Sequence, residues 1–415
     1  MIIQGTVKSL GMDADGLVEH EGEKYYVPYT APGDVIEFEV IKEKRRTRLN
    51  VTQIITPSPL RTTPPCSHFG SCGGCKLQHV TNEFYLDFKM QQLIRALDFH
   101  GVVPEEVRAV HVIPEHKRRR ISLTFAHRFE GMVLGYVRRQ SKHIIDVRQC
   151  FLIRPEIEIL LPKLRGFLGM LFPHRESGYV DIIASHTGLD VNVKTGYLKK
   201  LNLEQSELFT AFAVDNNLAR LSLNYRPVIT ICEPTVQFSG VNVLVEAGKF
   251  LQASDEADAY MLACVEEYMP KKIAYGLDLF SGRGTFTFLL AQKASVDAFE
   301  CEQDAINAMQ AAAKNVRADL NVIKRDLFTY PLQKEELAKY DFIMVDPPRA
   351  GALQQVEQIG QSTVKDLVYI SCSPASFARD AQVLKQYGFV LNSVTPLDQF
   401  LWSEHLEVIA KFSRL

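Results

Sequence analysis

Residues 276–286 read GLDLFSGRGTF, and this stretch decides the fold class. An apolar strand runs into a glycine turn and then into the start of a helix. Glycines let the backbone approach a ligand where a side chain would clash, and open α/β sheets bind ligands at the carboxyl ends of their strands. A dinucleotide fingerprint needs a third glycine, which this turn lacks. The stretch therefore predicts a site for a different nucleotide-like ligand.

From about residue 236 onward the chain alternates strands and helices. Expected strands cover 274–280, 296–300, 342–346 and 367–371, and expected helices cover 286–291 and 303–315. This alternation predicts an α/β fold with a parallel sheet and crossover helices. Glu300, Asp326 and Asp346 stand at or just after strand ends. Because Glu300 can accept both ribose hydroxyls, the pattern suits S-adenosylmethionine; the alternative is a set of exposed strand-end acids.

A cysteine ends another expected strand in residues 369–374, YISCSP. Cys372 is a candidate nucleophile, and Glu407, within residues 405–407 (HLE), is a candidate proton acceptor. One nucleophile and one base fit the methylation of a pyrimidine ring carbon if a methyl donor is also bound. The simpler alternatives are a buried small hydrophobe for Cys372 and an exposed acid for Glu407.

Residues 346–349, DPPR, follow the expected strand at 342–345. The two prolines restrict the backbone, so that an acid or a carbonyl there can be fixed against a flat base. Methyltransferases that act on exocyclic amino groups use a related Asp-Pro-Pro followed by an aromatic residue. Arg349 takes that place here, which argues against an amino-group target.

Residues 1–57 predict a small β domain of short strands and turns. In residues 34–40, DVIEFEV, the apolar side chains of Ile36, Phe38 and Val40 share one face. Several strands at this spacing predict a closed barrel of the OB-fold kind, which binds nucleic acid. After a linker at 57–59, residues 58–235 form an expected central domain and residues 236–415 the expected catalytic domain. The central domain is expected to contain a helix at 82–99 and strands at 120–126, 131–137 and 179–185.

Three of the eight cysteines, Cys66, Cys72 and Cys75, are clustered, and Cys150 follows a basic strand segment. Reduced thiols are expected in a chain of this size without an export signal. Structural zinc sites usually pair two short C-x2-C knuckles, whereas the fourth cysteine stands alone here. Three close cysteines and one distant one suit a 4Fe-4S cluster, with zinc and a metal-free site as alternatives. Methyl transfer needs no electron, so a role in folding or RNA contact is expected.

The net charge of −2 conceals a polarised distribution. Residues 108–148 carry ten Lys or Arg and three Asp or Glu, and a second basic run covers residues 42–48. A local basic surface indicates a polyanionic partner, against the alternative of a solvated charged face. Within it, Arg118, Arg119 and Arg120 are expected to contact RNA. No apolar run approaches the ~20 residues of a membrane span, and the N-terminus lacks a signal-peptide layout, so a cytoplasmic protein is expected.

The ordered set of motifs resembles the RNA uracil-5-methyltransferase family, and the whole chain resembles its iron–sulfur branch with a TRAM domain, the bacterial 23S ribosomal RNA enzymes. The segment 250–252, FLQ, also matches. The resemblance implies a Rossmann-like class I methyltransferase domain at 236–415 and a TRAM OB-like barrel at 1–57. It further implies an α+β central domain that carries a 4Fe-4S cluster on Cys66, Cys72, Cys75 and Cys150.

The resemblance also implies a mechanism. Cys372 would add to carbon 6 of uracil, carbon 5 would take the methyl group of S-adenosylmethionine, and Glu407 would remove the carbon 5 proton. The implied donor contacts are Gln252, Phe280, Thr285, Glu300 and Asp346, with Asp326 as a further contact. The chain departs from the family pattern at Ser281, where cysteine is common, and at Ser373, where asparagine is common, so local substrate contacts are expected to differ.

The expected substrate is a uridine in a loop or unstacked position of RNA, because the base must leave its stack to react. Phe377 and Trp402 are candidate stacking partners. The resemblance favours 23S ribosomal RNA, with transfer RNA as the alternative, and a monomer is expected. Enzymes that methylate cytosine carbon 5 typically place a cysteine after an Asp/Ala-Pro pair, which residues 346–349 lack. A non-catalytic RNA-binding or folding factor is the alternative from another class.

Overall fold

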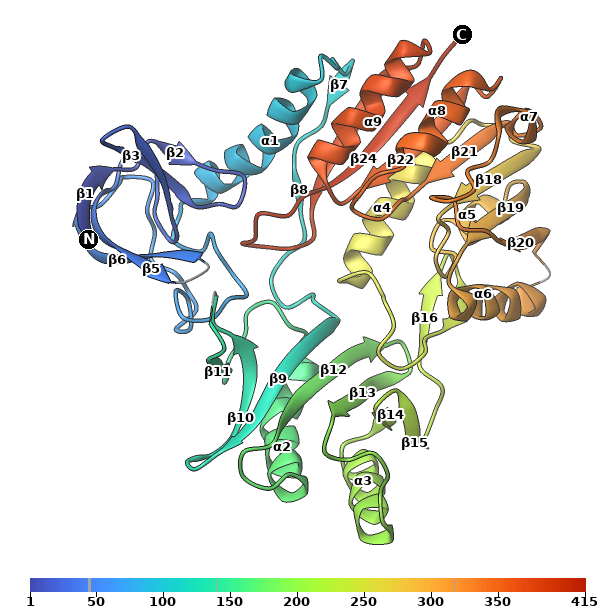
Figure 1. Cartoon of the computed structure of the whole chain (residues 1–415). Helices are drawn as coiled ribbons and strands as arrows, with labels where there is room; N and C mark the ends of the chain where they lie inside the picture. Colours follow the sequence, from blue (N-terminus) through green and yellow to red (C-terminus); the bar gives the residue numbers. More distant parts are fainter. Residues whose placement is uncertain (44–45, 140, 317) are drawn as a thin grey trace.

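The computed structural model describes residues 1–43, 46–139, 141–316 and 318–415. Figure 1 shows three parts: N-terminal strands in blue, a central sheet in green, and a larger sheet with its helices in yellow to red. The basic run predicted at 42–48 lies partly outside the described residues, since 44 and 45 are not among them.

The N-terminal part consists of two small sheets around one apolar core. One sheet has the order β1-β5-β6 and the other β2-β3-β4. The strands are β1 (Ile2–Thr6), β2 (Ser9–Leu10), β3 (Gly16–His20), β4 (Glu23–Val27), β5 (Val35–Glu43) and β6 (Arg46–Thr56). Ile36, Phe38 and Val40 are buried in the shared core, which confirms the alternation predicted for this segment.

The central part is a seven-stranded sheet with the order β11-β10-β9-β12-β13-β14-β15. Its strands are β9 (Arg120–Arg128), β10 (Gly131–Val137), β11 (Ile144–Asp146), β12 (Ser177–Ser185), β13 (Gly188–Thr195), β14 (Leu218–Leu223) and β15 (Arg226–Thr230). The helices α2 (Pro155–Leu171) and α3 (Leu203–Asp215) share one core with the apolar face of this sheet. Both helices lie below the sheet in Figure 1, whereas the larger sheet lies above it.

The C-terminal part is built on a nine-stranded sheet with the order β20-β19-β18-β21-β22-β24-β23-β7, in which β8 also pairs with β23. Its strands are β7 (Glu106–Val107), β8 (His111–Val112), β18 (Tyr275–Leu279), β19 (Ser295–Glu300), β20 (Leu320–Lys324), β21 (Phe342–Val345), β22 (Asp366–Ser371), β23 (Val390–Asp398) and β24 (Glu407–Ser413). The five strands from β18 to β22 are parallel, which confirms the predicted parallel sheet and adds β20 to the four expected strands, while β24 runs antiparallel between β22 and β23.

Helices cover this sheet, and one of them comes from far upstream in the chain. They are α1 (Asn82–Phe99), α4 (Asp255–Tyr268), α5 (Thr287–Ala291), α6 (Gln303–Val316), α7 (Lys334–Leu337), α8 (Leu353–Gln361) and α9 (Pro374–Gln386); a hairpin of β16 (Thr235–Phe238) and β17 (Val241–Leu244) precedes α4. The helix α1 packs beside α9 (Figure 1), and α1 shares a core with the sheet. The segment 82–112, which the sequence-based division assigns to the central domain, therefore contributes to the C-terminal layer.

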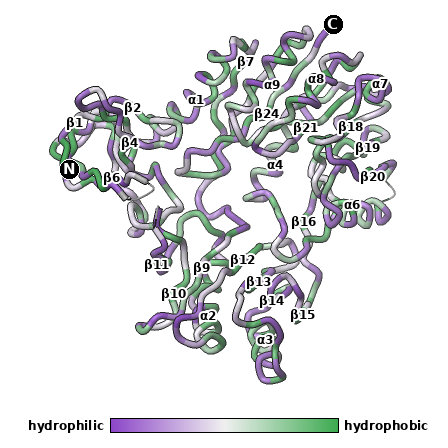
Figure 2. The backbone as a smooth tube through the Cα atoms, in the orientation of Figure 1, coloured by the Kyte–Doolittle hydropathy of each residue, from purple (hydrophilic) through white to green (hydrophobic). Residues whose placement is uncertain are grey.

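The core strands consist largely of apolar residues (Figure 2). In β21 (FIMV), for example, all four residues are apolar and buried. Burying such strands on both faces is typical of a parallel sheet that helices cover on each side. Within the described ranges, no helix combines the length and the apolar character that crossing a bilayer requires.

Candidate active site

The sequence-predicted site residues of the C-terminal sheet gather at one edge. Strands β18, β19, β20, β21 and β22 are parallel and end there, and the antiparallel β24 begins there. Parallel strands present their carboxyl ends at a common edge, which is where open α/β sheets bind ligands. The edge carries the following residues at strand ends or in the adjoining turns: Phe280, Thr285, Glu300, Asp326, Asp346, Cys372 and Glu407.

Cys372 and Glu407 stand opposite each other where the β22–β24 ladder ends. Ser371 of β22 pairs with Val408 of β24 in that ladder. The residues one position beyond this pair are Cys372 on one side and Glu407 on the other. Cys372 directly precedes Ser373, the N-cap of α9, whose side chain accepts a hydrogen bond from the Ser376 amide. The positive end of a helix favours a thiolate nearby.

The protonation of this pair is dominated by burial. Glu407 is only 5% exposed, and burial raises its pKa to about 7, against the opposing effect of a hydrogen bond from Gln399. Burial also raises the pKa of the Cys372 thiol to about 11, and the charges of Glu407 and Asp346 contribute to the rise, whereas Arg349 opposes it. The free site therefore holds a protonated thiol at neutral pH.

Gln399, which the sequence analysis did not identify, connects the proposed base to the predicted donor contact Gln252. Its Nε2 donates to Glu407 Oε1 at 2.8 Å and lies 3.3 Å from Gln252 Oε1. Gln399 is 6% exposed, and its own Oε1 has no hydrogen-bond partner among the described residues. Only the position of Gln399 one residue beyond β23, beside the start of β24, could have indicated this role.

The glycine turn after β18 is held by Glu300. One carboxylate oxygen of Glu300 accepts from the Gly282 amide at 2.8 Å, and the other accepts from the amides of Cys301 and Glu302 at 2.7 and 2.9 Å. Gly282 and Gly284 have φ values of 55° and 92°, which glycine adopts without strain. The turn and the end of β19 are thus fixed against each other before any ligand binds.

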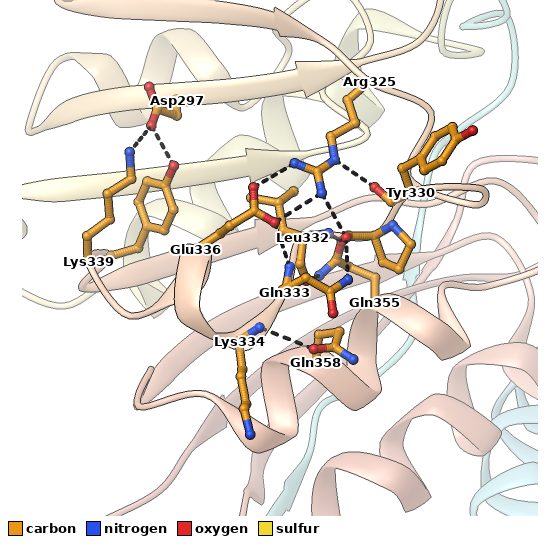
Figure 3. A network of polar contacts seen from close by, with 12 residues as sticks. Asp297, Arg325, Tyr330, Leu332, Gln333, Lys334, Glu336, Lys339, Gln355 and Gln358 are labelled. Atoms are coloured by element: carbon orange, nitrogen blue, oxygen red, sulfur yellow. Dashed lines mark hydrogen bonds and ion pairs between the residues drawn. The ribbon is translucent and has the colours of Figure 1, made fainter.

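Asp326 lies in the exposed turn after β20 and is engaged by that turn. Its carboxylate accepts from the amides of Phe328 and Thr329 and from the Thr329 hydroxyl, which hold its pKa below the ordinary value. The neighbouring Arg325 bonds to Glu336 and to the carbonyl oxygen of Tyr330 (Figure 3), so this turn is anchored to α7. Phe328 in turn lies 5.4 Å from Phe280, measured between ring centroids.

Asp346 directly follows β21, the strand between β18 and β22. Burial raises the pKa of Asp346 well above its ordinary value, and the nearby carboxylates of Glu407 and Asp278 raise it further. Asp278 is fully buried, accepts a hydrogen bond from Thr287, and has its own pKa raised to about 7 by burial. Burial and the repulsion between like charges therefore favour the protonated, neutral form of these carboxyl groups.

The four predicted metal-binding cysteines converge on one cavity. Cys66, Cys72, Cys75 and Cys150 all line a cavity of about 30 Å³ between the segment 66–78 and the central part. Burial raises the pKa of Cys72 to about 11 and of Cys75 to about 12. In the described part of the chain, no three His, Cys, Asp or Glu side chains are arranged to hold a single metal ion. The four thiols therefore share one cavity, and the predicted 4Fe-4S cluster stays a prediction.

The cysteine segment also touches the loop that precedes Glu407. The amides of Lys76 and Leu77, directly after Cys75, donate to the Trp402 carbonyl oxygen at 2.8 and 3.1 Å. Lys76 Nζ bonds to Glu404 at 2.6 Å, and the buried Lys89 of α1 bonds to Asp398 at 2.9 Å. The residues that directly follow Cys75 therefore bind the loop between β23 and β24.

Two sequence-based expectations are wrong. Arg119 is 1% exposed and forms ion pairs with Asp255 and Asp258 at the start of α4, so its guanidinium cannot contact RNA. Phe377 is fully buried in the core between α9 and the sheet, so it cannot stack on a base. Arg119 lies between the half-buried Arg118 and Arg120, and Phe377 lies on the inward face of α9; sequence alone does not reveal which of these side chains turns inward.

Arg118 and Arg120, on either side of Arg119, lie over aromatic rings, and Trp402, the second candidate stacking residue, is half-buried. Arg118 lies over the ring of Phe400 at 5.2 Å, and Arg120 lies over the ring of Phe250 at 4.8 Å. Phe250 is 65% exposed and stands two residues before Gln252. Trp402 is half-buried against the core that Leu77 and Tyr85 share.

The chain matches two family models. The model described as tRNA (Uracil-5-)-methyltransferase matches residues 240–414, and the TRAM domain model of tRNA (uracil(54)-C(5))-methyltransferase matches residues 3–60. The first match includes all the strands of the C-terminal sheet except β7 and β8, and the second coincides with the N-terminal strands.

The chain is also similar to known proteins over its whole length. An uncharacterized RNA methyltransferase of Brucella suis is 36% identical over 99% of this chain and 98% of the relative. The 23S rRNA (uracil(1939)-C(5))-methyltransferase RlmD of Pectobacterium atrosepticum is 30% identical over 98% of this chain and 92% of the relative. The crystal structure of Pyrococcus abyssi tRNA (uracil-54, C5)-methyltransferase shares the fold, with a TM-score of 0.74, 23% identity, and 99% and 100% of the two chains covered. The chain belongs to the RNA uracil-5-methyltransferase family, and it carries that family's TRAM domain.

Proposed function

We propose that this enzyme transfers a methyl group from S-adenosylmethionine to carbon 5 of a uridine in RNA, with Cys372 as nucleophile and Glu407 as base. The observation that carries the proposal is the opposition of these two residues across the end of the β22–β24 ladder. A nucleophile and a base that meet at a ligand-binding sheet edge are what ring-carbon methylation requires.

The chain's own residues would act in three steps. The Cys372 sulfur bonds to carbon 6 of uracil, and the electron pair of the 5,6 double bond moves toward carbon 5 as an enolate. The bound donor supplies an electrophilic methyl group, which carbon 5 accepts. Glu407 then removes the proton from carbon 5, the double bond re-forms, and Cys372 leaves carbon 6 as the thiolate.

The protonation states set a condition on this sequence. Cys372 must lose a proton before it attacks, although burial raises its pKa to about 11 in the free site. The helix start behind Cys372 and the nearby Arg349 both favour the thiolate. Glu407 must be ionised to accept the carbon 5 proton, and its raised pKa near 7 makes it a stronger base than an exposed glutamate.

The donor would lie along the edge formed by β18, β19 and β21. Proposed contacts are Gln252, Phe280, Thr285, Glu300, Asp326 and Asp346. The glycine turn supports this assignment because a Cβ at Gly282 would meet nothing within 4 Å, which leaves room for a ligand to approach the backbone. Glu300 and Asp326 are supported less directly, since backbone amides already bond to both carboxylates.

A 4Fe-4S cluster on Cys66, Cys72, Cys75 and Cys150 is the proposed metal group. Support comes from the spacing of the four cysteines and from the cavity that they share. The hydrogen bonds from Lys76 and Leu77 to Trp402 support a structural role for the cluster. By fixing the cysteine segment, the cluster would fix the loop that leads to Glu407.

We propose 23S ribosomal RNA as the substrate, because the relative named for that RNA matches along nearly the whole chain. A monomer and a cytoplasmic location stay predictions. The test incubates ribosomal RNA and transfer RNA from cells that lack the gene with anaerobically purified protein and S-adenosylmethionine. New 5-methyluridine in digests of 23S ribosomal RNA is expected; its appearance only in transfer RNA would overturn the substrate, and its absence from both would overturn the activity.

A further inference from the structure

Among the residues that the structure describes, no helix covers one face of the central sheet. The helices α2 and α3 pack on the apolar face, where Leu123, Phe125, Val180 and Val193 are buried. The residues between these positions in sequence point to the opposite face, because neighbouring strand residues alternate sides. That open face lies toward the C-terminal sheet (Figure 1).

The strand register arranges the open face in rows. In the first row Thr124, Tyr179 and Lys194 lie side by side on β9, β12 and β13. The second row consists of Ser122, Asp181 and Asn192, and the third begins with Arg120 and Ile183. The rows lead from an exposed tyrosine and a lysine toward Arg120, which stacks on Phe250 beside the active site.

Lys194 lies between two tyrosines. Its Nζ is 5.9 Å from the ring centroid of Tyr179 and 4.9 Å from that of Tyr225. The two rings are 53% and 49% exposed. Tyr225 has a φ of 67°, which is unusual for a residue with a side chain, and its amide is fixed by Asn192 Oδ1 at 2.9 Å. We refer to Tyr179, Lys194 and Tyr225 as the tyrosine–lysine face.

Two cavities place this face next to the reaction site. The first has a volume of about 360 Å³ and is lined by Thr124, Tyr179 and Lys194 among others. The second has a volume of about 230 Å³ and extends from Arg120 and Asp181 to Gln252 and Phe400. Tyr225 lies between them: it follows Asn224, which lines the first cavity, and its ring packs so closely on Gly248, which lines the second, that a Cβ at Gly248 would be 2.4 Å from it.

The charge and composition of the path suit a nucleic acid strand. Arg118, Arg120 and Lys194 face one acid, Asp181, and exposed aromatic rings alternate with these cations. Proteins bind single-stranded nucleic acid with this combination, in which bases stack on aromatic rings and cations meet phosphates. Ser122 and Thr124 make the remaining surface polar, so an apolar protein partner would find little matching area.

We propose that the tyrosine–lysine face binds nucleotides of the substrate RNA that flank the target uridine. Bases stack on Tyr179 and Tyr225, Lys194 neutralises a phosphate between them, and the strand continues past Arg120 to the reaction site. The inference rests on the proposed function for the identity of the RNA, but it requires only that the chain binds RNA.

The test compares Tyr179→Ala and Lys194→Glu with two matched controls. Tyr275→Ala removes a tyrosine of similar exposure, 56%, at the start of β18, away from the edge of the sheet that carries the site. Lys163→Glu reverses an exposed lysine on α2, which packs on the other face of the central sheet. Binding of a fluorescein-labelled oligouridine and methyl transfer to 23S ribosomal RNA from cells lacking the gene are measured, and melting temperatures verify folding. We expect each test variant to bind the oligouridine roughly tenfold more weakly. For methyl transfer we expect a higher KM for RNA with kcat retained, and wild-type behaviour of both controls.

The two readouts separate this inference from the proposed function. Folded test variants that bind oligouridine and ribosomal RNA as the wild type does would overturn the tyrosine–lysine face. Normal methyl transfer by the same variants would leave the proposed function intact. Weakened binding without methyl transfer to any RNA would support the face and overturn the proposed function. A wild-type protein that binds neither RNA would overturn both.

Discussion

Gln399 donates a hydrogen bond to Glu407 across 2.8 Å while the same amide nitrogen lies 3.3 Å from Gln252. This single side chain thus links the proposed base on β24 to the proposed donor contact ahead of α4. A donor that meets a buried carboxylate stabilises the ionised form, which lowers the pKa of the carboxyl group. Gln399 is therefore positioned to set the pH at which Glu407 becomes a base.

Replacing Gln399 with Leu is expected to raise the pKa of Glu407 above its value of about 7. The acidic limb of the kcat profile would move to higher pH, and the rate at neutral pH would fall roughly tenfold for each pKa unit. Binding of S-adenosylhomocysteine, measured by calorimetry, should change little. Gln237→Leu, an exposed position on β16, serves as the control. An unchanged pH profile would remove Gln399 from the mechanism.

Glu407 is expected to destabilise the fold at alkaline pH. Its pKa is about 7 in the folded chain and 4.5 in the reference state, so the folded chain retains a proton that the unfolded chain releases. Stability therefore falls as pH rises from about 4.5 to about 7. Glu407→Gln should raise the free energy of unfolding at pH 8 by roughly 2–3 kcal/mol and leave it nearly unchanged at pH ~4. Equal effects at both pH values in urea titrations would contradict the burial argument.

Arg119 is expected to contribute to stability instead of RNA binding. Arg119→Met leaves Asp258, which is 4% exposed, without its partner guanidinium, and breaking a buried ion pair costs roughly 3–5 kcal/mol. Denaturant midpoints should therefore fall sharply for this variant. They should hardly change for Arg148→Met, whose side chain is 73% exposed. If Arg119→Met keeps wild-type stability but binds RNA weakly, Arg119 contacts RNA after all, as the sequence predicted.

Loss of one cluster cysteine is expected to reduce methyl transfer without reducing donor binding. Cys75→Ser should remove iron and visible absorbance from anaerobically purified protein, and it should loosen the loop that Lys76 and Leu77 bind. Hydrogen exchange would then increase at residues 399–406. Cys232→Ser, an exposed cysteine outside the set, should retain iron and activity. Wild-type protein that lacks iron, whether metal-free or loaded with zinc, would contradict the cluster.

Much of the site follows from the chain's local patterns. The glycine turn, the strand-end acids and Cys372 belong to parallel strands, and any parallel sheet brings such ends together. The alternation of residues 34–40 likewise determines which side chains are buried. These features depend on neighbours in sequence, so sequence is sufficient to find them.

The remaining features depend on contacts between distant segments. Gln399 meets Gln252 across 147 positions, and Lys89 meets Asp398 across 309. No local pattern distinguishes the buried Arg119 from Arg118 and Arg120, because the ion pairs that decide its burial come from α4. The antiparallel insertion of β24, which places Glu407 opposite Cys372, likewise requires the complete sheet.

The most direct test of the central claim is a covalent adduct at Cys372. RNA that contains 5-fluorouridine at the target position traps it, because Glu407 cannot remove fluorine from carbon 5. Wild-type protein with this RNA and S-adenosylmethionine should form a complex that survives denaturing electrophoresis, with the RNA mapped to Cys372 by mass spectrometry. Cys372→Ala should bind the RNA and form no such complex. An adduct that persists in Cys372→Ala, or a wild-type protein that methylates uridine without forming one, would contradict the mechanism.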